Sequence, residues 1–486
     1  MTVNTTTPTE INRHLFNTDD VGAVFLEFAT SPSATSPRMG GIAYTAAGAA
    51  YATTAAVGAT STVQGGIART ATGVLHVTYS DFAPPSPSFV NGGVTVNGTG
   101  AVYVAEIPSF YAPFADLGAG VVDTTLTLGT GPATFTRATV AWTKLSTGLW
   151  ASVASGSPRS CYIGANTAVG DYGGYFAEAA GTQLVTPTAS IRDMTNAAWT
   201  AGATMTVAKD GVGIDGVTNS CSRLTGGAVE ATNTIFQTLV AAASSRTYSC
   251  WIKRVTGTGV INLTEDALGT ATDVTASINS STFTRVSVTA SVLNASFGIQ
   301  VVTSGDVILV DFNQFEAGAF ATSPMDAAGA ARNLDVLTYP FSGNGLDAQG
   351  TMYAEGYPLD AHGSNSGFLQ INDASANNQH QMQRSTTPVF VGVTVAATVG
   401  TGVCTTATTL ADATAFKAAY SWATNSFAAS ANGTAPTVDS SGAVPTGLTQ
   451  IRLSNALGNT GWNGFLKNVR IWQRQLPDAV LQAITT

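Results

Sequence analysis

The feature that most constrains the fold of this chain is the two-residue alternation of apolar and polar side chains along much of its length. The alternating runs are about four to eight residues long and are separated by Gly, Asn-Gly and Ser-Pro. Such a period places successive side chains on opposite faces of a strand, whereas a helix repeats every ~3.6 residues. We therefore predict an all-β protein, with a single short helical turn at 476–482 (LPDAVLQ), where a proline can open a helix.

A glycine-rich pattern occurs three times near the N-terminus. Residues 40–53 (GGIAYTAAGAAYAT), 65–78 (GGIARTATGVLHVT) and 92–105 (GGVTVNGTGAVYVA) each pass from Gly-Gly through a small-residue turn into an alternating run. A lone two-stranded hairpin is marginally stable in water, so these hairpins need a surface to pack on. We expect a three-hairpin stem in which Leu75 and Val77 pack against sister chains or a larger particle.

Composition narrows the class of function. Only 10% of the 486 residues are charged, against an average of about 25%, and Gly, Ala, Ser and Thr take their place, which favours a packed assembly over a free enzyme. The net charge of −9 gives no indication of the positively charged surface that nucleic-acid binding requires. The sequence has no apolar run of about 18 residues and no recognisable signal peptide, so we expect no membrane insertion.

The cysteines and the carboxylates give little support for catalysis. Cys161, Cys221, Cys250 and Cys404 are scattered; the pairing of Cys221 with Cys250 is left open, although small buried thiols are favoured. The four histidines lack metal-ligand spacing. A glycoside hydrolase needs two carboxylates ~5–10 Å apart, and the best sequence pairs are Glu265/Asp266 and Asp311/Glu316. For Glu316 we favour a structural carboxylate near a strand end, and for Asp306 a turn residue.

Residues 131–336 contain TFTRAT, NAAW, DGVGIDGVTNSCSRL, TYSCWIK, TFTRVSVT and FNQFEAGAFATSP in that order. This succession resembles the carbohydrate-binding-module-like jelly rolls of many tailed-phage virion proteins. The chain departs from the pattern at 181–184 (GTQL), where Arg-Thr-Asn-Leu is usual, so no role of that asparagine is transferred. The resemblance implies a jelly-roll domain over 131–336.

The last part of the chain resembles a concanavalin A/laminin-G-like sandwich. The resemblance rests on 350–384, 425–455 and 462–485, the last reading WNGFLKNVRIWQRQLPDAVLQAIT. It implies a second sandwich over 337–486 that is closed by a final strand and a helical turn. With an irregular arm at 1–37 and the hairpin stem at 38–130, the predicted fold is a series of repeated hairpins followed by two antiparallel β-sandwiches.

Sugar-binding sites combine aromatic faces with amide and carboxylate groups that form hydrogen bonds with the sugar hydroxyl groups. Trp199, Trp251 and Trp472 are interpreted as packing residues, whereas Trp422 and Trp462 flank loops and are the better surface candidates. The polar loop 373–380 matches the region where the resembled sandwich displays a loop rich in Asn and Asp, and such a loop could bind a sugar or calcium. A solvated hairpin loop is the favoured interpretation. The candidate residues are Asp373, Asn377, Asn378 and His380. No cofactor is predicted, and oxygen ligands would permit a structural calcium without fixing its site.

The expected function is a structural component of a phage or phage-like virion: a fibre, spike or decoration protein. Residues 1–130 would attach it to capsid, collar or tail proteins, and the sandwiches would bind host surface polysaccharide without catalysis. Assembly in the host cytoplasm, exposure on the particle and a homotrimer are expected, since such fibres are usually trimeric. The alternatives are a capsule depolymerase and an architectural cement or tail-assembly protein without a ligand.

Overall fold

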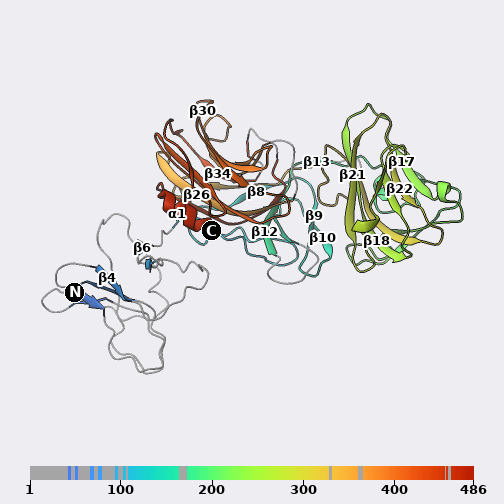
Figure 1. Ribbon diagram of the computed structural model, residues 1–486, viewed down its shortest axis with the longest axis horizontal. Coiled ribbons are helices and arrows are strands. Elements are labelled where there is room, and N and C mark those ends of the chain that lie inside the picture. The colour runs from blue at the N-terminus through green and yellow to red at the C-terminus, as the bar shows by residue number, and fades with distance from the viewer. Residues whose placement is uncertain are drawn as a thin grey trace, which may run out of the picture. The chain divides into compact units, whose positions relative to one another are not determined.

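The computed structural model describes residues 108–163, 172–327, 331–359, 365–454, 456–457 and 461–486, together with the backbone of six short strands between residues 42 and 104 (Figure 1). The chain divides into two units, 1–105 and 106–486. The predicted all-β class is confirmed. Among the described residues the α-helix is α1 (Asp478–Ile484), which begins after Pro477 as expected. No helix in the described part is long and apolar enough to cross a bilayer.

The first unit contains three antiparallel hairpins, as the repeats predicted. Each forms a two-stranded sheet of its own: β1 (Ile42–Tyr44) with β2 (Ala50–Ala52), β3 (Gly66–Arg69) with β4 (Leu75–Thr78), and β5 (Val94–Val96) with β6 (Val102–Val104). Leu75 and Val77 lie on β4, but their side chains are outside what the structure describes. Their packing partner therefore stays a prediction.

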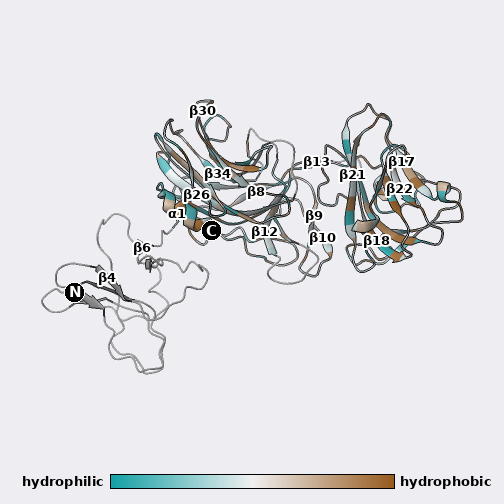
Figure 2. Cartoon of the chain, in the orientation of Figure 1, coloured by the Kyte–Doolittle hydropathy of each residue, from teal (hydrophilic) through white to brown (hydrophobic). Residues whose placement is uncertain are grey.

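The jelly roll consists of two five-stranded antiparallel sheets packed face to face. The first has the order β15 (Thr206–Gly211), β16 (Cys221–Thr225), β23 (Val307–Ala317), β18 (Ser245–Thr256), β21 (Thr284–Ser291). The second has the order β14 (Thr200–Ala201), β17 (Thr234–Thr238), β22 (Ser296–Val301), β19 (Ile261–Thr264), β20 (Ala271–Asp273). Alternate residues of β18, β19 and β22 enter the core, and Figure 2 shows the change between apolar and polar residues along β21.

The lectin-like sandwich has two larger sheets. One contains β30 (Val399–Thr409), β29 (Val389–Ala396), β28 (Gln379–Arg384), β27 (Ser366–Asn372), β34 (Gln450–Leu453), β25 (Val336–Pro340) and β8 (Thr134–Thr136). The other contains β11 (Arg159–Tyr162), β12 (Tyr172–Ala177), β35 (Gly464–Trp472), β26 (Gln349–Pro358), β31 (Phe416–Ala423), β32 (Ser426–Ala431) and β33 (Thr437–Asp439), with β7 (Phe110–Ala112) beside β35. Leu481 and Ile484 of α1 pack on this sheet and close it, as the resemblance implied.

The jelly roll is inserted within the sandwich, and this corrects the predicted boundaries at 131 and 336. The strands β8 and β12 precede the jelly roll in sequence but hydrogen-bond with β25 and β35, which follow it, so cyan strands lie among orange ones in Figure 1. The strand β11 joins the same sheet through β12. The chain enters through β13 (Gly181–Thr182) and leaves through β24 (Ala331–Arg332), and these two strands pair. The predicted stem also ends too late, because β7 already belongs to the sandwich.

A hairpin outside the inserted segment packs on the jelly roll. It is formed by β9 (Ala141–Lys144) and β10 (Trp150–Val153). The Trp142 ring meets Phe312 edge-on at 4.8 Å between centroids, and Trp150 meets Trp251 at 5.1 Å. These aromatic contacts join the inserted domain to the chain that precedes it.

Candidate functional site

The structure places both surface tryptophan candidates in the core of the sandwich, so their prediction as surface residues was wrong. Trp422 is 0% exposed and Trp462 is 1% exposed. The Trp422 ring stacks on His380 at 4.2 Å, and the Trp462 ring lies 5.3 Å from Phe368. The sequence placed them beside loops, but each ring turns inward to fill the space between the sheets.

The polar loop after β27 is closed by its own hydrogen bonds. Asp373 accepts hydrogen bonds from the backbone and hydroxyl of Ser375 through Oδ1, and from the Asn378 amide through Oδ2 at 2.8 Å. Asn377 is exposed. This agrees with the favoured hairpin-loop interpretation.

His380 does not belong to the exposed part of this loop, which corrects the prediction that grouped it with Asp373. It lies on β28 and is 0% exposed, because the side chain points into the core next to Trp422. Its Nδ1 lies 2.8 Å from Thr394 Oγ1. Burial lowers the pKa of His380 to about 3, so the ring is neutral at physiological pH.

Glu316 and Asp306 both make structural contacts within the jelly roll. Glu316 is 1% exposed and accepts hydrogen bonds from the Gln314 amide and from the backbone and hydroxyl of Thr322. Asp306 lies in the turn before β23 and pairs with Arg254 at 3.0 Å. The structural interpretations of both residues are confirmed. All four cysteines are buried and free, which also confirms the favoured interpretation of buried thiols.

Glu265 is a buried acid with incomplete hydrogen bonding. Its Oε1 accepts the N–H of Tyr248 at 3.0 Å, whereas Oε2 is buried without a hydrogen-bond partner among the described residues. Burial raises the pKa of Glu265 to about 7, and the hydrogen bond from Tyr248 opposes the shift only in part. Below about pH 7 the folded chain therefore favours the protonated acid.

Replacing Glu265 with Gln should stabilise the chain at pH 8 but not at pH 5. The folded pKa is raised from 4.5 to about 7, so wild-type stability is complete at low pH and falls as pH rises through this window. Gln cannot ionise and avoids that loss, which we expect to reach about 3 kcal/mol by pH 8. Urea denaturation at both pH values measures the difference. The control Asp266→Asn should give no gain at pH 8, since hydrogen bonds hold the pKa of Asp266 low despite its partial burial. An equal effect of Glu265→Gln at both pH values would refute this explanation.

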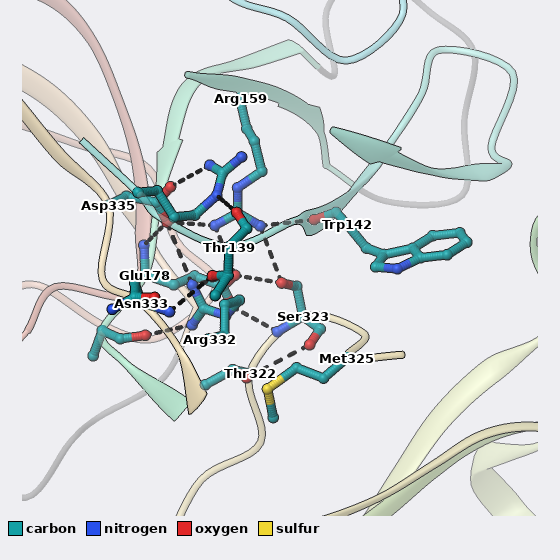
Figure 3. Close-up of polar contacts among 12 residues, drawn as sticks. Thr139, Trp142, Arg159, Glu178, Thr322, Ser323, Met325, Arg332, Asn333 and Asp335 are labelled. Atoms are coloured by element: carbon teal, nitrogen blue, oxygen red, sulfur yellow. Dashed lines mark hydrogen bonds and ion pairs between the residues drawn. The ribbon is translucent and has the colours of Figure 1, made fainter. Parts of the chain in front are cut away.

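A buried group of charges lies where the chain leaves the jelly roll (Figure 3). Three guanidinium groups form ion pairs with the Asp335 carboxylate: Arg137 Nη1 at 2.7 Å, Arg159 Nη2 at 2.5 Å and Arg332 Nη1 at 3.4 Å. The side chains of all four residues are at most 2% exposed. Charges removed from water in this way are tolerated only when they are paired and hydrogen-bonded.

Glu178 extends this group toward the jelly roll. It follows β12 of the sandwich, and its carboxylate lies 2.9 Å from Arg159 Nη2. Its Oε1 accepts the backbone N–H of Ser323, a residue that follows the last jelly-roll strand, at 2.6 Å. Burial alone would raise the pKa of Glu178, but Arg332, Arg159 and Ser323 lower it to about 2. The carboxylate is therefore ionised and engaged in joining the two domains.

Gln183 makes a second connection at the same junction and occupies the position where the resembled family has Asn. It is fully buried, and its Oε1 accepts the backbone N–H groups of Val185 and Phe315 at 3.1 and 2.9 Å. Its amide donates to the Asn313 carbonyl at 3.2 Å. The longer Gln side chain thus satisfies the backbone of two segments.

The outward face of the second jelly-roll sheet offers the geometry of a sugar site. In β17, Ile235 enters the core and Phe236 points outward, where it remains half-buried. Phe236 pairs with Gly298 of β22, and a Cβ at Gly298 would lie 2.7 Å from the Phe236 ring. The ring therefore covers the glycine, and its remaining surface is open to a ligand.

Several polar side chains share this face of the sheet with Phe236. The strand register puts Thr200 directly beside Phe236 and places Gln300 and Asn262 in the adjacent row, followed by Asp273. The Asn262 amide donates to Gln300 Oε1 at 2.9 Å. Hydrogen bonds from the Thr275 side chain and backbone lower the pKa of Asp273, which is therefore an anionic acceptor at neutral pH. An aromatic surface bordered by hydroxyl, amide and carboxylate groups can bind a sugar ring and its hydroxyl groups.

Phe236 is not among the site residues predicted from the sequence, where only tryptophans were candidates for surface aromatics. The signal was present in TIFQT (234–238), where alternation with the core residue Ile235 puts Phe236 on the opposite face. Within the described residues, no group of three His, Cys, Asp or Glu side chains could hold a metal ion.

No family model matches the sequence, and no curated protein matches it. Among solved structures, the chain is similar to the CBM40 module of the Ruminococcus gnavus IT-sialidase bound to α2,6-sialyllactose, at 14% identity and a TM-score of 0.27 over 31% of this chain and 92% of that one. A heptameric SAP-like pentraxin from Limulus polyphemus is similar at 12% identity and a TM-score of 0.24, over 29% of this chain and 70% of that one.

A third similar structure is the CBM22-1–CBM22-2 tandem domain of Paenibacillus barcinonensis Xyn10C. It matches at 11% identity with a TM-score of 0.22, over 61% of this chain and 99% of that chain. The jelly-roll assignment itself rests on the two packed antiparallel sheets described above.

Proposed function

We propose that this chain is a non-catalytic glycan-binding protein displayed on a phage or phage-like particle. The observation that carries the glycan-binding part is the half-buried Phe236 ring lying over Gly298 on a polar, outward-facing sheet. The motifs between residues 134 and 324 support the particle assignment, because they resemble those of tailed-phage virion jelly rolls. In this proposal the host surface polysaccharide is the ligand.

Display in many copies would compensate for weak single sites. A single aromatic contact binds a sugar weakly, and linked copies raise the effective concentration of the second binding event. We propose that residues 1–105 attach the chain to other virion proteins and that the chain forms a homotrimer. The attachment segment is shorter than the sequence indicated, since residues from 108 onward are used by the sandwich.

A glycan array probed with the full chain tests the proposal. Phe236→Ala should weaken binding to the positive glycans about tenfold, because losing an aromatic contact of roughly 1.4 kcal/mol changes affinity by that factor. The control Leu293→Ala removes an apolar side chain that is 65% exposed elsewhere on the jelly roll and should leave binding unchanged. Absence of any glycan signal, or equal signals from wild type and Phe236→Ala, would reject the proposed site.

A further inference from the structure

The two sheets of the jelly roll differ sharply in charge. The five strands of the second sheet contain no Lys or Arg, and Asp273 is their one charged residue. The strands of the first sheet contain six basic residues, namely Lys209, Arg223, Arg246, Lys253, Arg254 and Arg285. The outward face that carries Phe236 therefore offers a ligand hydroxyl and amide groups but no cation from its strands.

Asp273 lies at the far end of the polar row on this face. The register places it opposite Asn262, which in turn lies opposite Gln300. Three strand spacings of ~4.8 Å separate β20 from β17, which carries Phe236, so the two residues are about 14 Å apart across the sheet. One sugar ring cannot span that distance, so a ligand that meets both residues is an oligosaccharide that crosses the strands.

Negative charge borders this path in two places. Asp273 is exposed, and its Oδ1 accepts the N–H of Thr275 at 2.8 Å. Asp266 lies at another edge of the face, where its Oδ1 accepts the Thr264 hydroxyl at 2.8 Å and the Thr270 N–H at 2.7 Å. A ligand carboxylate on this path would meet like charges without a cation from the strands to compensate them.

This arrangement distinguishes between classes of glycan. The hydroxyl groups of a neutral sugar can bond with the amides and can donate to a carboxylate. An acidic sugar has the same hydroxyl groups, but its carboxylate is repelled, and such repulsion is a source of specificity. We infer that the Phe236 face binds uncharged oligosaccharides and discriminates against acidic ones, with Asp273 as a specificity-determining residue; the inference rests on the proposed function.

An array of paired oligosaccharides tests this inference with the full chain. Each neutral tetrasaccharide of glucose, galactose or mannose is printed beside its C6-oxidised form, in which carboxylates replace the primary alcohols. The binding counted is the part that Phe236→Ala loses. At about 20 mM salt the oxidised form should bind about fivefold more weakly than its neutral partner, and the difference should shrink at about 500 mM salt because exposed charges are screened.

Replacing Asp273 with Asn isolates the charge, because Asn keeps an oxygen that can accept the Thr275 N–H. The ratio of oxidised to neutral binding should rise about fivefold in this variant at low salt, and Asp273→Lys should raise it further. The matched control Asp210→Asn removes the same charge from an exposed carboxylate on β15 of the first sheet and should leave the ratio unchanged. An equal loss of both forms in Asp273→Asn would show a merely structural role and would overturn the assignment of specificity to Asp273.

The results that contradict this inference differ from those that reject the proposed function. Oxidised forms that bind as tightly as their neutral partners, with binding lost in Phe236→Ala, would overturn the inference and keep the proposed glycan site. An unchanged ratio in Asp273→Asn would overturn the role of Asp273 alone. Absence of any signal that depends on Phe236 would reject the proposed site and this inference with it.

Discussion

Replacing Asp335 with Asn should lower the free energy of unfolding by about 3–5 kcal/mol. The substitution removes the negative charge that holds Arg137 and Arg159 at 2.7 and 2.5 Å, while the arginines stay buried. Breaking a buried ion pair by removing one partner is costly because the other charge loses its compensation. Denaturation with urea, followed by tryptophan fluorescence, measures the loss.

The same substitution at an exposed ion pair provides the control. Asp210 pairs with Arg223 at 2.9 Å, and these side chains are 51% and 35% exposed. Asp210→Asn should therefore cost less than about 1 kcal/mol. If Asp335→Asn were no more destabilising than Asp210→Asn, the buried charges would not hold the domain junction together.

Replacing Trp462 with Ala should cost about 3–5 kcal/mol of unfolding free energy and leave glycan binding unchanged. The indole fills the sandwich core between Phe368 and Phe416, with ring centroids 5.3 and 6.1 Å away. Its removal leaves a cavity that close-packed neighbours fill only in part. The control Leu117→Ala, at a side chain 65% exposed, should change stability by less than about 0.5 kcal/mol. A stable Trp462→Ala variant that no longer binds glycans would restore the surface role expected from the sequence.

The all-β class could be predicted from the sequence because the alternation of apolar and polar residues is a local property. The same holds for the three hairpins, whose strands lie a few residues apart, and for α1, which a proline opens. The insertion of the jelly roll could not be predicted in this way. It depends on pairings such as Thr136 with Val336, which are 200 residues apart in the chain and leave no local signal.

The candidate site was less predictable than the fold. The chain neighbours of Trp422 and Trp462 look like loop boundaries, but the direction of a side chain depends on which sheet covers its strand. The residue Phe236 could have been found from the alternation around Ile235. The buried charges could not have been found from the sequence. Arg137 comes before the inserted domain and Asp335 after it, so the two residues meet only in the folded chain.

The most direct test of glycan binding at Phe236 is a crystal structure of the full chain with the oligosaccharide that gives the strongest array signal. We expect one sugar ring to lie against Phe236, with its hydroxyl groups within hydrogen-bond distance of Thr200 or Asn262. An oligosaccharide bound to the sandwich or to another jelly-roll face, with Phe236 free, would contradict the proposed site.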